Sequence, residues 1–357
     1  MSAHLARLFI FLFLGFSVLP LTAQKDFQQL DSLLTQLHQT AQLNGVVLVA
    51  ENGVIQYQKA FGQLDVSGKV PLSLDASFNL ASITKQFVGM LMMIAKEEGK
   101  LRYDDPVAGI LPELPYSGLS FRHLATHTSG LPEYFDLAVN EMGPLDTLDN
   151  EGLLHLLARM QPPLDFLPGE QWSYSNTGYL MLALALERLY QRPLHLLFKE
   201  KIVQPLGLSN TFGYQLLLKE APPAHVKGIR RENGKWVPED LTPLDGVIGD
   251  GNFYASALDL LRWEQSLYES KLVSAETLAE AFQPVRLNDG TTYPYGFGWF
   301  LDPEAGIVSH TGGWVGFTNI IVRDLKNKAT LIVLTNGSDG SAIRLVPAWY
   351  QGKSLPA

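Results

Sequence analysis

Hydrophobic positions near the start of the chain recur first with the period of a helix and then with that of a strand. Residues 27–42 carry phenylalanine and leucines at a spacing that places them on one helix face. Residues 46–50 are all apolar, and a polar turn containing Asn52 and Gly53 connects them to a second strand-like segment at 54–61. The pattern predicts an amphipathic helix followed by an antiparallel hairpin.

The middle and the end of the chain differ in the same way. Residues from about 100 to 210 are mostly helical in pattern and form a predicted helical insertion. A further helix is expected from Ser341, which Pro347 should end or kink. Strands are expected at 295–301, 306–310, 317–323 and 329–335. Strands at both chain ends with helices between them predict an α+β fold, in which one antiparallel sheet is built from both ends and flanked by helices.

The first residues resemble a targeting segment. His4 and Arg7 precede the apolar run 8–19, and Ala23 offers a small residue at a cleavage point. We therefore expect a signal peptide at 1–23, a mature domain at 24–357 and a periplasmic or secreted protein. The apolar run is short for a membrane span, and no later segment could form one, although an uncleaved anchor is the alternative.

Composition narrows the classes of function. The chain has 357 residues, 46% of them hydrophobic, which suits one large domain or two closely packed ones. The formal net charge of −9 argues against a nucleic-acid partner. Because cysteine is absent, disulfides, thiolate chemistry and cysteine metal sites are excluded.

A candidate nucleophile lies at the start of the helix predicted for residues 88–100. Ser82 and Lys85 are three residues apart, so they share a helix face. A serine needs a base to become a good nucleophile, and a lysine in a desolvated pocket can lose its charge and act as that base. The helix N-terminus also favours negative charge near Ser82. The alternative is a capping serine with a solvated lysine, because S-x-x-K alone is a weak pattern.

Tyr174 and Asn176 begin another predicted helix and could complete such a site. A phenol beside an ammonium group can shuttle a proton, and an amide can hydrogen-bond a substrate carbonyl or Lys85. Taken alone, Y-x-N is equally typical of a turn tyrosine followed by a helix-capping asparagine.

A third stretch, His310 to Trp314, follows a predicted buried strand. Gly312 and Gly313 would let a substrate backbone approach the strand edge, and a backbone N–H there could stabilise an oxyanion. The alternative for His310 is an ordinary polar residue at a strand end.

Two histidines could suggest a metal site. His123 and His127 lie one helical turn apart, but no glutamate follows His123 as in the metalloprotease pattern. A structural role for both is therefore favoured, and we expect neither a metal nor another cofactor.

In this order, S-x-x-K, Y-x-N and H-T-G resemble the motifs of the serine β-lactamase-like and penicillin-binding protein family. The resemblance is to its branch of class C β-lactamases, D-alanyl-D-alanine carboxypeptidases, D-aminopeptidases and esterases. It extends over about residues 44–336 and includes the stretches 122–131, 249–251 and 312–316.

The resemblance implies a β-lactamase/transpeptidase-like fold and a role for each motif residue. Ser82 would form an acyl-enzyme, Lys85 and Tyr174 would exchange the proton, and water would release the acyl group. The implied catalytic residues are Ser82, Lys85 and Tyr174, the implied substrate-binding residues are Asn176, His310, Thr311 and Gly312, and the implied oxyanion hole consists of the N–H groups of Ser82 and Gly313.

One departure bears on the substrate. Many β-lactamases have lysine where this chain has His310, and histidine is mostly neutral at pH 7. This favours a peptidase or esterase that cleaves an amide or ester bond of a small molecule or peptide. The alternatives are a true class C-type β-lactamase and a non-catalytic penicillin-binding or sensor module, although an inactive relative would be expected to lose at least one motif residue.

Overall fold

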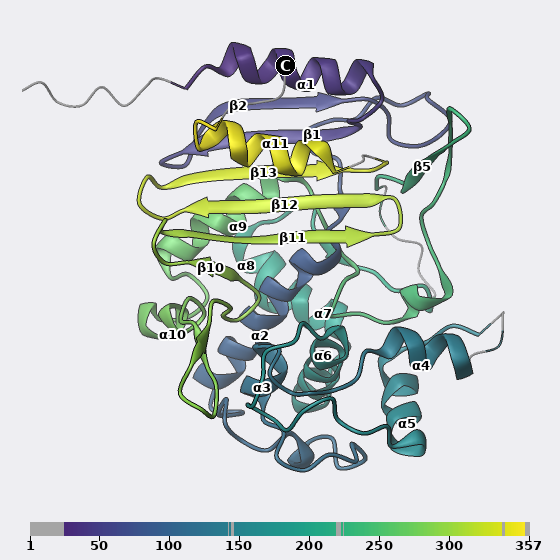
Figure 1. Cartoon of the computed structure of the whole chain (residues 1–357), viewed down its shortest axis with the longest axis vertical. Helices are drawn as coiled ribbons and strands as arrows, with labels where there is room; N and C mark the ends of the chain where they lie inside the picture. Colours follow the sequence, from purple (N-terminus) through teal and green to yellow (C-terminus); the bar gives the residue numbers. More distant parts are fainter. Residues whose placement is uncertain are drawn as a thin grey trace, which may run out of the picture.

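The computed structural model describes residues 25–141, 143, 146–218, 223, 225–337 and 340–353, so the expected signal peptide lies outside the described residues. A six-stranded antiparallel sheet has the order β10-β11-β12-β13-β1-β2 (Figure 1). Its strands are β1 (Gly45–Glu51), β2 (Val54–Phe61), β10 (Phe300–Asp302), β11 (Ile307–Trp314), β12 (Phe317–Asp324) and β13 (Ala329–Thr335).

The two ends of the chain meet in the middle of this sheet. Strand β1 pairs with β13, with Val47 opposite Val333, and both side chains are fully buried. Apolar strands without alternation fit this position because both faces of the sheet are covered. The predicted α+β fold with one antiparallel sheet built from both ends is therefore confirmed.

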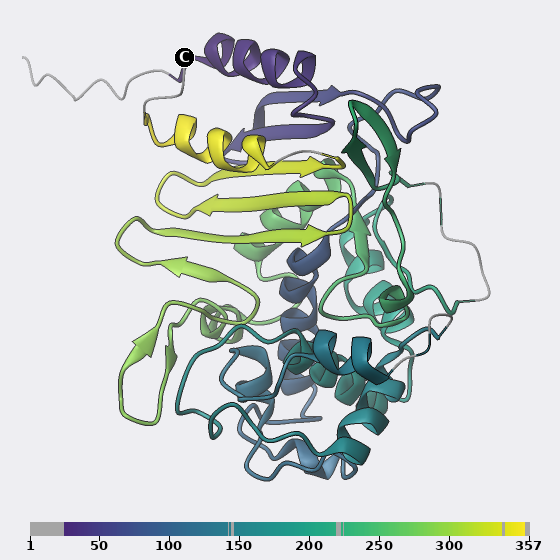
Figure 2. The same ribbon diagram turned by 45° about the vertical axis from the view of Figure 1, so that its right-hand side comes forward.

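Helices cover both faces of the sheet. Helices α1 (Phe27–Gln39) and α11 (Ser341–Tyr350) lie on one face, where Leu30 and Leu34 enter an apolar cluster with β1 and β13 (Figure 2). Helix α9 (Ala257–Glu269) packs on the other face. Helix α2 (Thr84–Glu97) runs from this face into the helical part of the molecule, and its residues 84–95 are all buried.

The predicted helical region occupies the lower half of Figure 1. Helix α6, whose residues 177–186 are all buried, packs against α2 and brings the Tyr174 stretch beside the Ser82 stretch. The elements of this region are η2 (Val107–Gly109), α3 (Phe121–Ala125), α4 (Tyr134–Glu141), α5 (Asn150–Met160), α6 (Asn176–Tyr190), α7 (Leu194–Phe198), the π-helical turn η3 (Lys199–Val203) and α8 (Gln204–Leu206). Its description as an insertion stays a prediction.

A small sheet, in which β7 (Phe253–Ala255) pairs with β3 (Phe78–Asn79) and with β4 (Phe212–Gly213), connects the six-stranded sheet to the helical region. Strand β3 leads into the 3₁₀ turn η1 (Ala81–Ile83), which precedes α2. Strand β7 pairs with β3 and so places the glycine-rich stretch 246–251 beside Ser82. The remaining elements are β3 (Phe78–Asn79), β4 (Phe212–Gly213), β5 (Ile229–Glu232), β6 (Lys235–Pro238), η4 (Pro243–Gly246), β7 (Phe253–Ala255), α10 (Ala275–Glu280), β8 (Val285–Arg286) and β9 (Thr292–Tyr293).

Three boundaries differ from the sequence prediction. Strand β11 continues to Trp314 because β12 pairs with it over the whole length, with Trp314 opposite Phe317. The strand expected at 295–301 is limited to β10. Pro347 lies inside α11 and does not end it: the carbonyl of Pro347 accepts a hydrogen bond from the N–H of Gln351 at 3.0 Å, and α11 is held on the sheet by its buried side chains.

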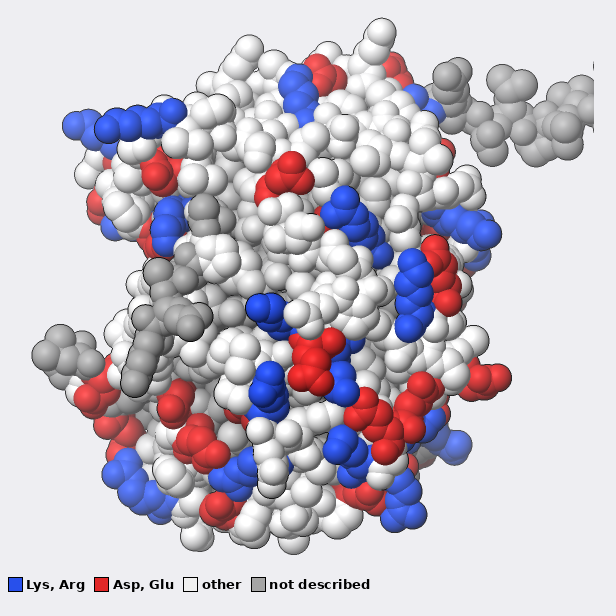
Figure 3. Space-filling model, turned by 180° about the vertical axis from the view of Figure 1, so that it is seen from behind, with Lys and Arg blue, Asp and Glu red and all other residues white. Residues whose placement is uncertain are grey.

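The surface shows no sorting of charge on the face drawn in Figure 3. Lysine, arginine, aspartate and glutamate side chains are interspersed there, so this face carries no extended basic patch among the described residues. Within the same residues, no helix combines the length and the apolar character needed to cross a membrane.

Candidate active site

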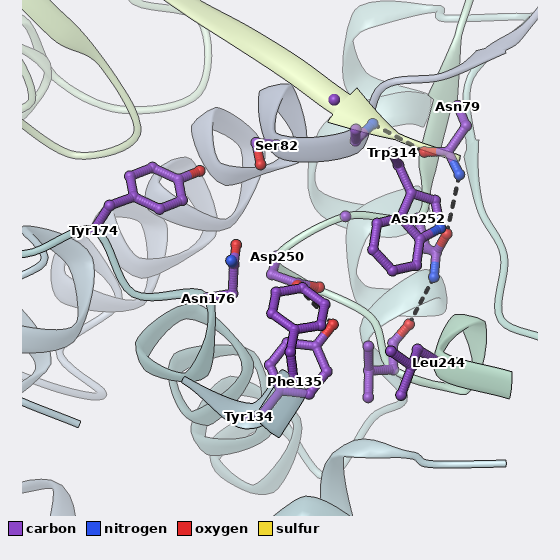
Figure 4. A pocket seen from close by; sticks show the side chains of 14 residues that line it. Asn79, Ser82, Tyr134, Phe135, Tyr174, Asn176, Leu244, Asp250, Asn252 and Trp314 are labelled. Carbon is purple, nitrogen blue, oxygen red and sulfur yellow. Dashed lines mark hydrogen bonds between the residues drawn. The ribbon is translucent and has the colours of Figure 1, made fainter. Parts of the chain in front are cut away.

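Ser82 lies in a strained turn at the mouth of a cavity. The preceding residue, Ala81, has φ of +48°, a left-handed conformation that is costly for a residue with a β carbon. The side chain of Asn79 holds this turn by accepting a hydrogen bond from the N–H of Ala81 at 2.9 Å. The strained turn directs Ser82 to the edge of the cavity instead of into the core (Figure 4).

Asparagines from other elements support Asn79. Its amide donates to the side-chain oxygen of Asn252 at 3.1 Å, and its backbone oxygen accepts from the amide of Asn319 at 2.8 Å. All three residues are buried, so these amides satisfy one another. The sequence does not reveal this support, because an isolated asparagine has no periodic signal.

Lys85 is fully buried and lies next to the Ser82 hydroxyl. Its Nζ is 3.1 Å from Ser82 Oγ, 2.8 Å from Asn176 Oδ1 and 2.8 Å from the backbone oxygen of Asp250. The structure therefore excludes the alternative of a solvated lysine. The third contact comes from the glycine-rich stretch, which in the sequence was noted only as part of the family resemblance.

Tyr174 closes the other side of this group. Lys85 Nζ lies 5.0 Å from the centre of its ring, and Figure 4 shows its hydroxyl directed toward Ser82. Behind the ring lies His127, with the two ring centres 4.2 Å apart. His127 is fully buried, its Nδ1 accepts a hydrogen bond from the N–H of Ser175 at 3.0 Å, and burial lowers its pKa well below the ordinary value. His127 therefore supports the Tyr174 stretch as a neutral side chain.

His123 has a separate, local role. Its Nδ1 accepts a hydrogen bond from the N–H of Ser120, at the start of α3. Among the residues that the structure describes, no group of three or more histidine, aspartate or glutamate side chains could hold a metal ion.

Strand β11 presents two faces at the site. Gly313 lines the cavity, and a β carbon there would meet no atom within 4 Å. The side chain of Thr311 lies on the same face of the strand as Gly313, because side chains alternate along a strand, and it is exposed next to the cavity. Gly312 faces inward against Leu80, where a β carbon would overlap the backbone oxygen. Glycine is therefore needed at position 312 for packing, whereas the sequence prediction assigned it to the approach of a substrate.

His310 also faces inward. The sequence prediction had placed it in the substrate groove. It is 1% exposed, its Nδ1 lies 2.6 Å from the backbone oxygen of Thr311, and its Nε2 lies 3.1 Å from the hydroxyl of Tyr295. Because a carbonyl can only accept, Nδ1 carries the proton and Nε2 accepts from Tyr295. Burial, with a smaller effect of the Lys85 charge, lowers the pKa of His310 to about 3. His310 is therefore neutral at pH 7.

The cavity has a volume of about 350 Å³, and four of the fourteen described residues that line it are aromatic. Phe135 and Trp314 stack in its wall with ring centres 5.9 Å apart, and Trp314 Nε1 donates to the buried carboxylate of Asp245 at 2.8 Å. The described residues that line it are Asn79, Ala81, Ser82, Tyr134, Phe135, Tyr174, Asn176, Leu244, Val247, Asp250, Gly251, Asn252, Gly313 and Trp314. None of these is lysine or arginine.

Asp250 is the acidic residue of this wall. It is buried, and its Oδ2 accepts a hydrogen bond from the hydroxyl of Tyr134 at 3.3 Å. Burial raises its pKa to about 6, so the carboxylate is mostly ionised at pH 7. Its position between Gly249 and Gly251 was noticed in the sequence, but that position does not reveal that the side chain enters the cavity.

A second carboxylate, Glu133, stands behind Asn176. Its two oxygens accept hydrogen bonds from the backbone N–H of Asn176 at 2.6 Å and from the side-chain Nδ2 at 3.0 Å. Glu133 lies in the loop after α3, where hydrophobic periodicity gives no signal, so its role was not predicted from the sequence.

The structure thus brings Ser82, Lys85, Tyr174, Asn176 and Gly313 to one cavity and leaves His310 and Gly312 behind its wall. A hydroxyl within hydrogen-bonding distance of an amine, with a phenol close by, is a combination suited to nucleophilic attack on a carbonyl.

Comparison with known proteins agrees with this chemistry. The family model described as Beta-lactamase matches residues 30–352. Penicillin-binding protein 4* of Bacillus subtilis (strain 168) is 37% identical over 337 residues, which cover 88% of this chain and 72% of the relative. The D-aminopeptidase of Brucella anthropi is 28% identical over 282 residues, which cover 76% of this chain and 52% of the relative.

Solved structures show the same fold. The octameric penicillin-binding protein homologue from Pyrococcus abyssi aligns with a TM-score of 0.78 and 26% identity, covering 92% of this chain and 78% of that chain. The family match over most of the sequence and the 37% identical relative confirm the resemblance seen in the motifs. The chain belongs to the beta-lactamase family of serine hydrolases.

Proposed function

We propose that this protein cleaves an amide or ester bond through an acyl-enzyme on Ser82. The observation that carries the proposal is the position of Lys85 Nζ, 3.1 Å from Ser82 Oγ at the edge of the cavity. Ser82 Oγ attacks the substrate carbonyl carbon, its proton passes to Lys85 or Tyr174, and that proton then protonates the departing amine or alcohol. Water, activated near Tyr174, hydrolyses the acyl-enzyme and restores Ser82.

In its neutral form, Lys85 can act as a base within these contacts. A neutral amine has two N–H donors and one lone pair. Its two carbonyl partners, Asn176 Oδ1 and the backbone oxygen of Asp250, can only accept hydrogen bonds. Both N–H groups are therefore directed to these oxygens, and the lone pair is left for the proton of Ser82.

The oxyanion would be held beside strand β11. We assign its two donors to the N–H groups of Ser82 and Gly313, because both residues border the same cavity. Asn176 would contact the substrate amide as well as Lys85, and Thr311 would contact substrate at the exposed edge. We assign His310 an indirect role, since both of its ring nitrogens have protein partners.

The charges of the wall favour a neutral or amine-bearing substrate over one that carries a carboxylate. Among the described residues, no lysine or arginine lines the cavity, and the nearby Lys85 is fully buried and contacts Ser82. Asp250 supplies a negative charge, and Phe135 and Trp314 supply apolar surface. A peptidase- or esterase-like activity is therefore preferred to turnover of β-lactams, which carry a carboxylate. The name of the D-aminopeptidase relative points the same way.

Labelling tests the acyl-enzyme directly. Wild-type protein should react covalently with a fluorescent fluorophosphonate or penicillin, and Ser82→Ala should abolish the label while its thermal unfolding stays cooperative. Screening amino-acid amides, short-chain esters and nitrocefin with the same control identifies the leaving group. Ester hydrolysis by a protein that neither probe labels would refute the acyl-serine route, and sustained nitrocefin turnover would favour a β-lactamase.

We further propose that residues 1–23 are a cleaved signal peptide, that residues 24–357 form one hydrolase domain and that the protein is periplasmic or secreted. The support is the basic start, the short apolar run and Ala23 in the sequence. N-terminal sequencing of the exported protein tests this proposal. A small-molecule or peptide substrate, with no nucleic-acid partner and no cofactor, remains our expectation.

A further inference from the structure

The orientation of the Asn176 side chain depends on a residue outside the cavity wall. An asparagine amide presents an oxygen on one side and an NH₂ group on the other, and only its surroundings determine which faces where. The amide of Asn176 lies between Lys85 Nζ, 2.8 Å from Oδ1, and Glu133 Oε2, 3.0 Å from Nδ2. Its orientation therefore follows from the chemistry of these two neighbours.

Glu133 is the neighbour that determines the orientation of the Asn176 amide. An ionised carboxylate can only accept hydrogen bonds, so the NH₂ group of Asn176 must face Glu133 and the oxygen must face Lys85. The other oxygen of Glu133 accepts from the backbone N–H of Asn176 at 2.6 Å, which holds the carboxylate in place at the start of α6. The loop itself is fixed by the hydroxyl of Thr177, which donates to the backbone oxygen of Pro132 at 2.8 Å.

We infer that Glu133 is a positioning residue for the reaction, which sets the Asn176 amide so that the lone pair of Lys85 points at Ser82. The inference rests on the proposed acyl-enzyme function. If the amide were reversed, its NH₂ group would face Lys85 and compete with Ser82 for that lone pair. Glu133 thus acts three contacts away from the nucleophile, through Asn176 and Lys85, without touching the substrate.

The simpler explanation is that Glu133 only caps helix α6. The chain offers a matched control, because Glu187 accepts a hydrogen bond from the backbone N–H of Leu194 at the start of α7, also at 2.6 Å. Glu187 lies outside the active-site cavity. A role limited to capping would give Glu133→Gln and Glu187→Gln the same modest loss of stability and no change in catalysis.

Glu133→Gln keeps the size of the side chain and one acceptor for the backbone N–H, but it places an NH₂ group toward the Asn176 amide. We expect kcat/KM for p-nitrophenyl acetate to fall roughly 10- to 100-fold, the effect of disturbing one hydrogen bond to a charged group. The loss should lie in kcat and not in KM, because Glu133 acts through Asn176 and Lys85 and does not line the cavity. Glu187→Gln should change neither quantity.

A reciprocal exchange makes the test decisive. In the double variant Glu133→Gln with Asn176→Asp, the introduced amide can donate to the introduced carboxylate, whose second oxygen faces Lys85. Asn176→Asp alone instead sets two carboxylates against each other. We expect the double variant to exceed Asn176→Asp at least tenfold in kcat/KM.

The inference is overturned if Glu133→Gln keeps wild-type kcat and KM, or if the two substitutions combine as independent factors. If Glu133→Gln does not fold, the comparison of Asn176→Asp with the double variant still decides, and failure of the exchange to restore folding or activity also refutes the inference. Probe labelling that depends on Ser82, together with a silent Glu133→Gln, would leave the proposed function standing and remove only this inference.

Discussion

Gly312 of strand β11 lies directly against the backbone oxygen of Leu80, two residues before the candidate nucleophile. A β carbon at position 312 would overlap that oxygen, so the approach of the strand to the Ser82 turn requires glycine. The next residue, Gly313, faces the open cavity. The two adjacent glycines therefore have different roles: Gly312 permits close packing against the Ser82 turn, and Gly313 keeps the cavity open.

Alanine substitutions should separate these demands. Gly312→Ala should lower the free energy of unfolding by about 1–3 kcal/mol, because the methyl group forces the strand away from the turn. Gly313→Ala should leave the urea midpoint near wild type but slow probe labelling of Ser82, since the methyl group projects into the cavity. Urea unfolding and labelling rates measure both effects. Equal unfolding midpoints for the two variants would contradict the packing argument.

The ion pair between Arg323 and Glu264 should matter for stability. Their side chains are each 2% exposed, and Arg323 Nε lies 2.9 Å from Glu264 Oε1. Glu264→Gln leaves the arginine charge buried without its counter-ion, so we expect a loss of about 3–5 kcal/mol in the free energy of unfolding. Urea denaturation measures this loss.

The half-exposed pair Lys59–Asp31 provides the comparison, with side chains 40% and 43% exposed. Lys59→Met should cost about 1 kcal/mol or less, since solvent screens the pair. Similar losses for Glu264→Gln and Lys59→Met would show that burial does not strengthen the first pair.

His310 should make stability depend on pH. Its pKa is about 3 in the folded protein, mainly because of burial, against an ordinary value of 6.5. Below pH 6.5 the unfolded chain therefore binds a proton that the folded protein does not bind, and stability is lost as the pH falls toward 3. The contribution is fully present above pH 6.5.

The titration can be isolated by comparing wild type with His310→Asn, which has no titrating side chain at this position. The stability advantage of wild type should shrink by roughly 2 kcal/mol between pH 7.5 and pH 5, at about 1.4 kcal/mol for each pH unit below 6.5. Chemical denaturation at the two pH values measures it. An advantage that stays constant would mean that His310 is not held neutral.

Asp250 should influence which substrates are accepted. Because the Asp250 carboxylate lines the cavity, wild type should prefer an amino-acid p-nitroanilide, which carries an amine, to its N-succinyl derivative, which carries a carboxylate. Asp250→Asn should reduce the ratio of the two kcat/KM values about tenfold, an electrostatic effect of roughly 1.4 kcal/mol. In wild type the same ratio should fall as the pH drops through 6, near the raised pKa of Asp250. A wild-type preference for the succinyl substrate would contradict the proposed charge selectivity.

Much of the architecture was accessible from hydrophobic patterns. The hairpin at 46–61, the strands at 317–323 and 329–335 and the buried helix after Ser82 follow from periodicity, because burial of one or both faces imposes it. The β11 boundary was predicted wrongly, since Thr311 to Gly313 are neither apolar nor β-branched throughout. Pairing with β12, which lies later in the sequence, extends the strand to Trp314.

The spacing of Ser82 and Lys85 along the chain was by itself enough to determine their proximity, because residues three apart on a helix share a face. Only the tertiary structure decided the surroundings of that pair. Glu133 reaches Asn176 across 43 positions, and Asp250 reaches Lys85 across 165. The orientation of His310 away from the cavity was likewise a result of packing. Helical geometry acts within a few residues, whereas these contacts exist only because the sheet and the helices pack around one core.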